Sequence, residues 1–231
     1  MLNKNLIKTK FEKSIMHYST NASIQQKMAL ELCSKIPCKK FNSILEIGSY
    51  TGFLTHSLIQ KFEFDDYLAL DIVNSFDFIK NLSSKISFKQ ADIEQVELNQ
   101  KFDLITSNAS LQWCEDIEFT IKKLLSYLNS KGIIAISIFG KDNMKEIKEV
   151  FNIGLNYPEI NEIKTLFSKN ALICQKIETV QFKTPLELLR HLKLTGVNAI
   201  SNKPLNLSQI KKNLKFLDEK YQNKLTYNPI Y

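Results

Sequence analysis

Short apolar runs alternate with stretches of helical spacing along the first 140 residues. Residues 11–36 carry apolar side chains on one helical face, and Pro37 ends that pattern. The apolar runs are typical of buried parallel strands and cover residues 43–48, 67–71, 86–90, 102–107 and 133–139. Helical patterns separate some of these runs, at residues 51–62 and 117–128. Because strands that alternate with helices form right-handed βαβ crossovers, the pattern predicts an α/β fold around a parallel sheet.

The alternation of apolar runs and helical patterns ends after Gly140. Residues 185–195 begin with a proline and stop before Gly196, which are common helix boundaries. The other elements expected in this part are helices at 143–153 and 207–222, an extended stretch at 172–182 and a final strand at 225–231. We therefore predict one domain over residues 1–231, with a helical cap (1–40), a core (41–140) and a C-terminal part (141–231) that contains a helical insertion at about 183–224.

Glycines and acids follow the first three strands of the predicted sheet. Gly48 and Gly52 flank the first strand-to-helix turn, Asp71 ends the second strand and Asp92 follows the third. A tight turn of this kind needs glycine whatever its function, so the aspartates carry the interpretation. In open α/β sheets, ligands bind outside the carboxyl ends of the strands, where an acid can accept hydrogen bonds from ribose hydroxyls. The sequence thus predicts a nucleoside site at this edge.

The segment Leu45–Gly52 (LEIGSYTG) resembles the first motif of the class I S-adenosylmethionine-dependent methyltransferases, an acid followed by GxGxG. The resemblance implies a Rossmann-like, seven-stranded α/β sheet with an N-terminal helical segment and a C-terminal helical insertion. It also implies S-adenosylmethionine as the cofactor, with Glu46 supporting the methionine part, Asp71 holding the ribose and Asp92 flanking the adenine. The full cofactor-binding set that it implies is Glu46, Gly48, Ser49, Gly52, Asp71, Ile72, Asp92, Ile93 and Asn108.

Tyr50 stands where that family has its middle glycine. A tyrosine disfavours a positive φ and adds bulk beside the cofactor. We expect its ring to point away from the crevice, so that binding survives. A nucleotide-dependent dehydrogenase is disfavoured, because Glu46 precedes the glycines and the third glycine of GxGxxG is absent.

A narrower resemblance begins at the fourth strand. Residues 107–113 (SNASLQW) are similar to the SNAALQW segment of the malonyl-acyl-carrier-protein O-methyltransferases of biotin synthesis. Further stretches agree with that family near the start (Phe11, Tyr18, Ala22, Gln25), in the segment 182–196 and at Thr226-Tyr227. This resemblance implies methylation of the free carboxylate of a malonyl thioester. The alternatives are a related methyltransferase of a small carboxylic acid and a non-catalytic protein that keeps the fold.

A malonyl carboxylate is ionised near pH 7, so its attack on a sulfonium methyl needs no general base. Arg190, the only arginine of the chain, is the candidate for holding this carboxylate. A guanidinium makes two parallel hydrogen bonds to a carboxylate, which a lysine cannot do. The alternative for Arg190 is a surface helix position or an internal ion pair. Tyr18, Gln112 and Trp113 complete the predicted catalytic set, although plain packing would also explain Tyr18 and Trp113.

The net charge of +7 favours an acidic partner, and the resemblance implies an acyl carrier protein bearing the malonyl thioester. Lys183, Lys193 and Lys203 are candidates for steering it, although lysines are also spread along the whole chain. A nucleic-acid partner is not expected, because an NPPY-like motif and a dense basic stripe are absent.

Four cysteines without a CxxC pair and three scattered histidines predict free thiols and no metal site. No apolar run approaches the roughly 20 residues that span a bilayer, and the N-terminus lacks a secretory pattern. We therefore expect a cytoplasmic protein without a membrane partner.

Overall fold

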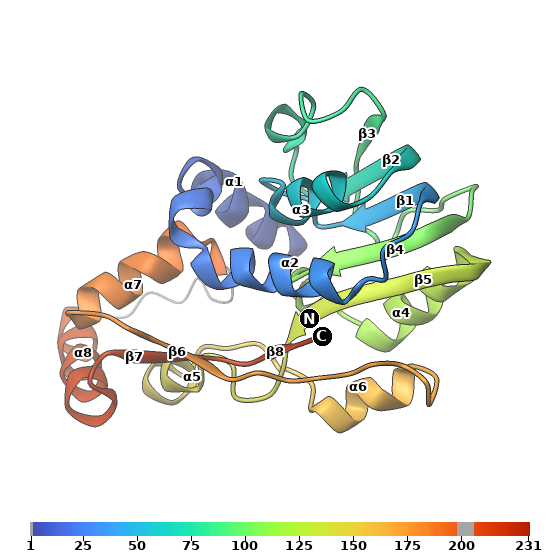
Figure 1. Ribbon diagram of the computed structural model, residues 1–231. Coiled ribbons are helices and arrows are strands. Elements are labelled where there is room, and N and C mark those ends of the chain that lie inside the picture. Colours follow the sequence, from blue (N-terminus) through green and yellow to red (C-terminus); the bar gives the residue numbers. More distant parts are fainter. Residues whose placement is uncertain (1, 198–205) are drawn as a thin grey trace.

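The computed structural model describes residues 2–197 and 206–231, in which six strands form one twisted sheet (Figure 1). The strands lie in the order β3-β2-β1-β4-β5-β8. Their bounds are β1 (Phe41–Ile47), β2 (Phe64–Asp71), β3 (Ile86–Gln90), β4 (Phe102–Asn108), β5 (Leu128–Phe139) and β8 (Pro229–Ile230). The first five are parallel, and only β8 runs antiparallel, beside the end of β5. The sheet confirms the predicted α/β class.

The seventh position of the expected sheet is reduced to a bridge. Gln175 pairs with Ile230 beyond β8, and Cys174 exchanges backbone hydrogen bonds of 3.0 and 2.9 Å with Tyr231. The predicted extended stretch 172–182 contributes one named strand, β6 (Glu178–Gln181). This strand pairs with β7 (Lys224–Tyr227) in a separate antiparallel ribbon.

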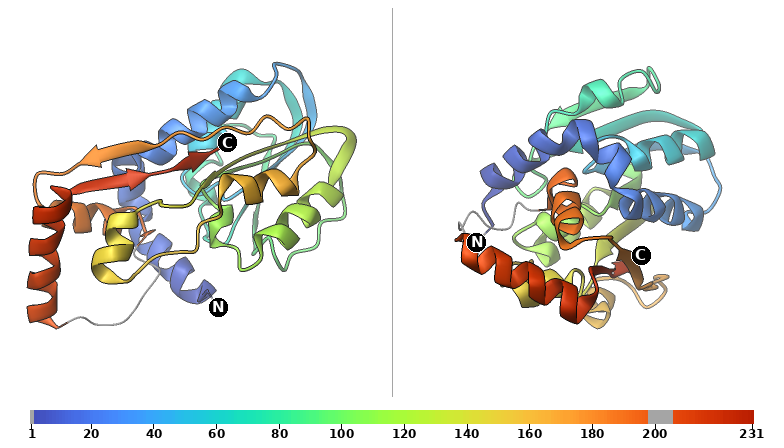
Figure 2. Two further views of the ribbon diagram at one scale, coloured as in Figure 1. Left: turned by 90° about the horizontal axis from the view of Figure 1, so that it is seen from below. Right: turned by 90° about the vertical axis from the view of Figure 1, so that its left-hand side faces the viewer.

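Helices cover both faces of the sheet. Figure 2 shows α2 on one side of β5 and α4 with α6 on the other. Helices α2 (Ser23–Lys35), α3 (Phe53–Lys61), α4 (Ile117–Ser126) and α6 (Ile160–Leu166) flank the sheet, whereas α5 (Lys145–Phe151) packs on β7. A further group, α1 (Lys4–Asn21), α7 (Pro185–Leu194) and α8 (Leu207–Tyr221), gathers beyond the carboxyl ends of the strands (Figure 1).

The N-terminal cap differs from the single helix expected over residues 11–36. The structure has two helices there, because Ala22 leaves helical geometry (φ −92°, ψ 51°) and its N–H bonds the carbonyl of Tyr18. The first helix also begins earlier, at Lys4, where the Asn3 side chain caps it by accepting from the N–H of Leu6. Helix α6 was not predicted.

The central strands β1 and β4 are buried on both faces, as a parallel sheet requires. Ile44, Leu45, Leu104 and Ile105 are fully inaccessible to solvent. This rigid centre fixes the loops that follow the two strands. No helix of the described part of the chain is long and apolar enough to cross a membrane. Nor do the described histidines, cysteines and acids form a group of three that would hold a metal ion.

Candidate functional site

The turn between β1 and α3 depends on two glycines. Gly48 (φ 74°) and Gly52 (φ 86°) both adopt the left-handed backbone that favours glycine. The N–H of Gly48 donates to the carbonyl of Leu70 at 2.7 Å, which ties the turn to the end of β2. A Cβ atom at Gly48 would lie 2.2 Å from Ser110 Oγ. The loop after β4 therefore packs directly on the loop after β1, and only glycine permits this approach.

Tyr50 has a left-handed backbone too (φ 40°), and its side chain is buried. Its hydroxyl donates to the carbonyl of Phe11 on α1 at 2.6 Å, and its ring meets the Tyr18 ring edge-on with centroids 4.6 Å apart. Burial raises the pKa of Tyr50, so the hydroxyl stays a donor. The ring thus lies under α1 rather than in the cavity described below, in agreement with the orientation expected from the sequence.

Asp71 lies at the centre of the site. One carboxylate oxygen accepts from the N–H of Tyr50 at 2.9 Å and the other from the N–H of Val73 at 2.8 Å. Burial raises the pKa of Asp71 to about 6, although these backbone N–H groups act in the opposite direction. The carboxylate is therefore oriented by the turn and still ionised near pH 7, where it can accept further hydrogen bonds.

A cavity of about 60 Å³ lies beside this carboxylate. Five of the predicted cofactor residues line it, namely Gly48, Asp71, Ile72, Asp92 and Ile93. Ser110, Trp113 and Cys114 close one side, while Lys4 and Ile7 of α1 form the roof. Sites for small molecules typically hold about 300 Å³ or more, so α1 or the 110–114 loop must move to admit a nucleoside.

The roof is held by an ion pair. Lys4 Nζ lies 2.5 Å from Glu94 Oε2 and 3.3 Å from Asp92 Oδ2. Glu94 also accepts from the backbone N–H groups of Glu115 and Asp116. Together these contacts depress the pKa of Glu94 despite its partial burial. Sequence reasoning missed Lys4 and Ile7, because residues 4–10 lack a clear apolar face.

The other four predicted cofactor residues do not line the cavity. Glu46 accepts from the hydroxyls of Thr55 (2.6 Å) and Tyr67 (2.5 Å), and burial raises its pKa to about 7. Asn108 donates to the carbonyl of Gln25 at 2.9 Å and accepts from the hydroxyl of Ser137. Gly52 caps α3, and Ser49 lies buried in the turn. Glu46 and Asn108 therefore hold neighbouring elements in place.

Several buried oxygens at this edge have no hydrogen-bond partner among the described residues. They include Ser49 Oγ after β1, Gln112 Oε1 after β4 and Gln25 Oε1 in the first turn of α2. A buried polar atom without a partner is rare in proteins and marks a place where a ligand or water completes the bonding. With the Gly48 cradle and Asp71, these atoms fit a polar nucleoside ligand. Gln25 was not a predicted site residue.

Three of the four predicted catalytic residues lie on α1 or in the segment after β4, namely Tyr18 on the helix and Gln112 and Trp113 in that segment. Trp113 meets Phe11 edge-on at 5.4 Å, and Tyr18 packs against Tyr50. Burial raises the pKa of Tyr18, so its hydroxyl is neutral. Gln112 is held by a 2.6 Å bond from its Nε2 to the carbonyl of Ala109.

The fourth, Arg190, lies apart. Helix α7 buries Leu188 and Leu192, whereas Arg190 is on its exposed face and does not line the cavity. The neighbouring His191 fixes α7 to the ribbon through a 2.7 Å hydrogen bond between its Nε2 and the hydroxyl of Tyr227. Burial lowers the pKa of His191 to about 4, so the ring is neutral at pH 7.

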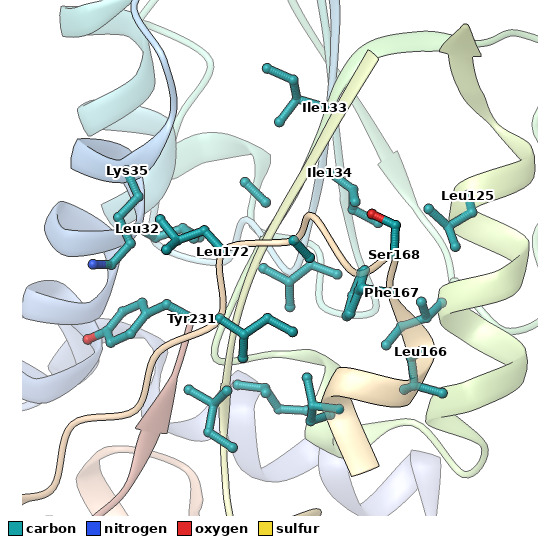
Figure 3. A pocket seen from close by; sticks show the side chains of 18 of the residues that line it. Leu32, Lys35, Leu125, Ile133, Ile134, Leu166, Phe167, Ser168, Leu172 and Tyr231 are labelled. Atoms are coloured by element: carbon teal, nitrogen blue, oxygen red, sulfur yellow. The ribbon is translucent and has the colours of Figure 1, made fainter. Parts of the chain in front are cut away.

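A larger cavity, of about 600 Å³, flanks β5 on both sides (Figure 3). Its walls are mostly aliphatic, with Leu125 and Leu166 on one side of the strand and Leu32 and Leu172 on the other. No aspartate, glutamate or histidine lines it. It therefore offers space without chemistry, and the smaller crevice at Asp71 is the candidate site.

Comparison with known proteins shows the family of the chain. Residues 21–202 match the family model described as a methyltransferase domain. The chain is 34% identical to the malonyl-[acyl-carrier protein] O-methyltransferase of Calditerrivibrio nitroreducens, over 97% of this chain and 94% of that protein. It is 31% identical to the protein of the same name from Haemophilus influenzae, over 100% of this chain and 94% of that protein.

A solved structure shares the fold at low identity. The YcgJ protein from Bacillus subtilis superposes with a TM-score of 0.63 at 12% identity, covering 87% of this chain and 95% of that one. The sheet order, the glycine turn and these similarities agree: the chain belongs to the malonyl-[acyl-carrier protein] O-methyltransferase family, within the methyltransferases of class I fold.

Proposed function

We propose that the protein transfers the methyl group of S-adenosylmethionine to the free carboxylate of a malonyl thioester on an acyl carrier protein, an early step of biotin synthesis. The observation that carries this proposal is the buried Asp71 carboxylate beside the Gly48 turn, at the carboxyl edge of the sheet. The named activity of the relatives supplies the substrate class.

The residues that line the crevice would contact different parts of the nucleoside. Asp71 would accept hydrogen bonds from the ribose hydroxyls, since its carboxylate is fixed by two backbone N–H groups. Ile72 and Ile93 would cover the faces of the adenine, with Asp92 at its rim. When bound, the cofactor supplies an electrophilic methyl group on a sulfonium sulfur.

The aromatic residues of α1 and of the segment after β4 would exclude water and position the two reactants. An ionised carboxylate needs no base, and the approach of an anion to a cation is favoured where water is absent. Phe11, Tyr18 and Trp113 provide aromatic walls for such a space. The neutral Tyr18 hydroxyl would donate a hydrogen bond to the carboxylate, and alignment would supply most of the rate.

Arg190 stays a proposed ligand of the malonyl carboxylate. Its exposed position on α7 requires this helix to rearrange together with α1, which it contacts. The Arg190→Ala variant tests this role when its kcat/KM is compared for malonyl-coenzyme A and the malonyl carrier protein. A carboxylate ligand lowers both values, whereas a residue that contacts only the carrier lowers the second alone.

The basic balance of the chain supports an acidic carrier protein as partner. Lys183 and Lys193 are exposed just before and on α7, next to the helix that roofs the crevice. Lys203, the third lysine predicted from the sequence, lies outside the described residues.

The direct test is incubation with labelled S-adenosylmethionine and malonyl carrier protein, followed by mass spectrometry of the acyl group. The proposal predicts that the malonyl group gains one methyl as an ester. Methylation of small free acids in preference to the thioester would overturn the substrate. Failure to bind the cofactor at all would overturn the reaction.

A further inference from the structure

Two glutamine side chains near the ends of β1 and β4 end in unsatisfied carbonyl oxygens. Gln25 is only 4% exposed, yet its Oε1 has no partner among the described residues. The Oε1 of Gln112 is equally buried and unpartnered. The orientation of the Gln112 amide is fixed, because its Nε2 already donates to the carbonyl of Ala109. Its oxygen is therefore left to accept a bond from something else.

Contacts between the loops bring these oxygens to one place. The side chain of Asn108, at the end of β4, donates to the backbone carbonyl of Gln25 at 2.9 Å. Gly48, at the end of β1, touches Ser110, two residues before Gln112. Ser49 follows Gly48, and its buried hydroxyl also lacks a partner among the described residues. The three free oxygens thus belong to residues at or next to the point where the loops after β1 and β4 meet the start of α2.

The chemistry of these oxygens indicates which kind of ligand group would satisfy them. A carbonyl oxygen can only accept, so a group that satisfies two of them must donate several hydrogen bonds. A positively charged donor gains more from such a site than a neutral one. Asp71 and Asp92 lie at the ends of β2 and β3, and β1 and β4 are the next strands of the sheet. A ligand whose ribose and adenine are held by these acids therefore extends its other substituent toward β1 and β4. In S-adenosylmethionine that part is an amino acid, whose α-ammonium group carries three N–H donors.

We propose that Gln25 is a cofactor-binding residue, whose carbonyl oxygen accepts a hydrogen bond from the α-ammonium group of the cofactor together with Gln112 and Ser49. This assignment rests on the proposed function and adds to it a contact from the N-terminal helical cap. It also gives α2 a direct part in binding.

Calorimetric titration with two nucleosides tests the assignment. S-adenosylhomocysteine has the amino-acid part, whereas 5′-methylthioadenosine lacks it but keeps the ribose and adenine. The variant Gln25→Leu is expected to weaken binding of the first by roughly tenfold or more and to leave binding of the second unchanged. Gln26→Leu is the matched control, because Gln26 is the exposed neighbour on the same helix and should change neither affinity.

A second variant separates an ammonium contact from a carboxylate contact. Gln25→Glu keeps an acceptor and adds a negative charge, so it should retain or tighten S-adenosylhomocysteine. If Gln25 instead bound the α-carboxylate, this variant would bind more weakly than Gln25→Leu. Thermal denaturation of each variant checks that it is folded. If Gln25→Leu does not fold, Gln112→Leu gives the same comparison of the two nucleosides.

The outcomes separate this inference from the proposed function. Equal weakening of both nucleosides by Gln25→Leu assigns the residue a structural role and overturns the inference. Unchanged binding of both shows that Gln25 does not contact the ligand and also overturns it. If the unmodified protein binds neither nucleoside, the proposed function itself fails.

Discussion

The crevice at Asp71 and the cavity along β5 differ in size and in chemistry, and the smaller of the two is the polar one. The cavity along β5 is about ten times larger than the crevice at Asp71, at about 600 against 60 Å³, but its walls are aliphatic. The turn beside the crevice places Tyr50, a residue with a side chain, in left-handed backbone next to a buried acid. Such features each cost folding free energy and persist where the rest of the fold over-determines them.

Buried polar groups without partners therefore indicate the site better than cavity volume does. Buried polar atoms without partners concentrate at the ends of β1 and β4. The β5 cavity is closed by packing contacts that hold the sheet to α2, α4 and α6. Substitutions in the crevice should therefore change ligand affinity, and substitutions in the β5 cavity should change stability.

The largest effect is expected at Asp71. Asp71→Asn removes a charged acceptor and places an NH₂ group opposite the N–H of either Tyr50 or Val73. The two ribose hydroxyls would lose their hydrogen bonds to a charged carboxylate, which together are worth about 3–6 kcal/mol. The affinity for S-adenosylhomocysteine should therefore fall at least a hundredfold. Calorimetry measures it, with the exposed Asp77→Asn as control. An unchanged affinity would remove Asp71 from the site.

The β5 cavity should behave as core. Ile121 is 2% exposed and lines this cavity, so Ile121→Ala should lower the free energy of unfolding by about 2–4 kcal/mol. Affinity for the nucleoside should not change, because the residue lies away from the crevice. Urea denaturation and calorimetry measure the two quantities. Lost affinity at full stability would mean that the larger cavity takes part in binding.

Glu46 should make stability depend on pH. Its pKa is about 7 in the folded protein against a usual value of 4.5, so the folded state retains a proton that the unfolded chain releases between these values. Stability should therefore decrease as pH rises from 4.5 to 7. Glu46→Gln keeps an oxygen that accepts from Thr55 and Tyr67. It should exceed the unmodified protein in unfolding free energy by about 1–3 kcal/mol at pH 8, with no gain at pH 4.5.

The Tyr50 hydroxyl should contribute less. Tyr50→Phe deletes the hydrogen bond to the Phe11 carbonyl and keeps the ring contacts, at an expected cost of about 0.5–1.5 kcal/mol in unfolding free energy. Since the ring does not line the cavity, affinity for 5′-methylthioadenosine should stay within a few-fold of the unmodified protein. Tighter binding of that nucleoside by tenfold would show that the hydroxyl holds α1 closed against it.

The smallest effect should come from the surface. The double variant Lys183→Glu/Lys193→Glu should lower kcat/KM for malonyl carrier protein a few-fold at low salt and flatten its salt dependence. Lys131→Glu changes an exposed lysine in β5, at the opposite edge of the sheet from the crevice, and serves as control. Equal effects of the two substitutions would argue against a docking role for α7.

The sheet could be predicted from the sequence because its strands are continuous apolar runs, whose carboxyl ends bring Gly48, Asp71 and Asp92 together. The orientation of Tyr50 was also accessible, since a ring in the crevice would exclude a ligand. The break at Ala22 was not, because neither proline nor glycine marks it. A buried Gln25 and a solvent-facing glutamine also look alike until the helix is placed against β4.

The catalytic role of Arg190 stays a prediction, but its position on α7 was open to sequence analysis. A single arginine in a lysine-rich chain indicated a geometric demand, but the pattern of α7 already contained the counter-evidence. Leu188 and Leu192 lie one turn apart and define the buried face, which leaves Arg190 on the other side.

A crystal structure of the protein with S-adenosylhomocysteine tests the candidate site most directly. We expect the nucleoside between Gly48, Asp71 and Asp92, with α1 or the 110–114 loop displaced and the ribose hydroxyls on the Asp71 carboxylate. A nucleoside seated in the β5 cavity, or a crevice that stays closed at saturating ligand, would contradict it.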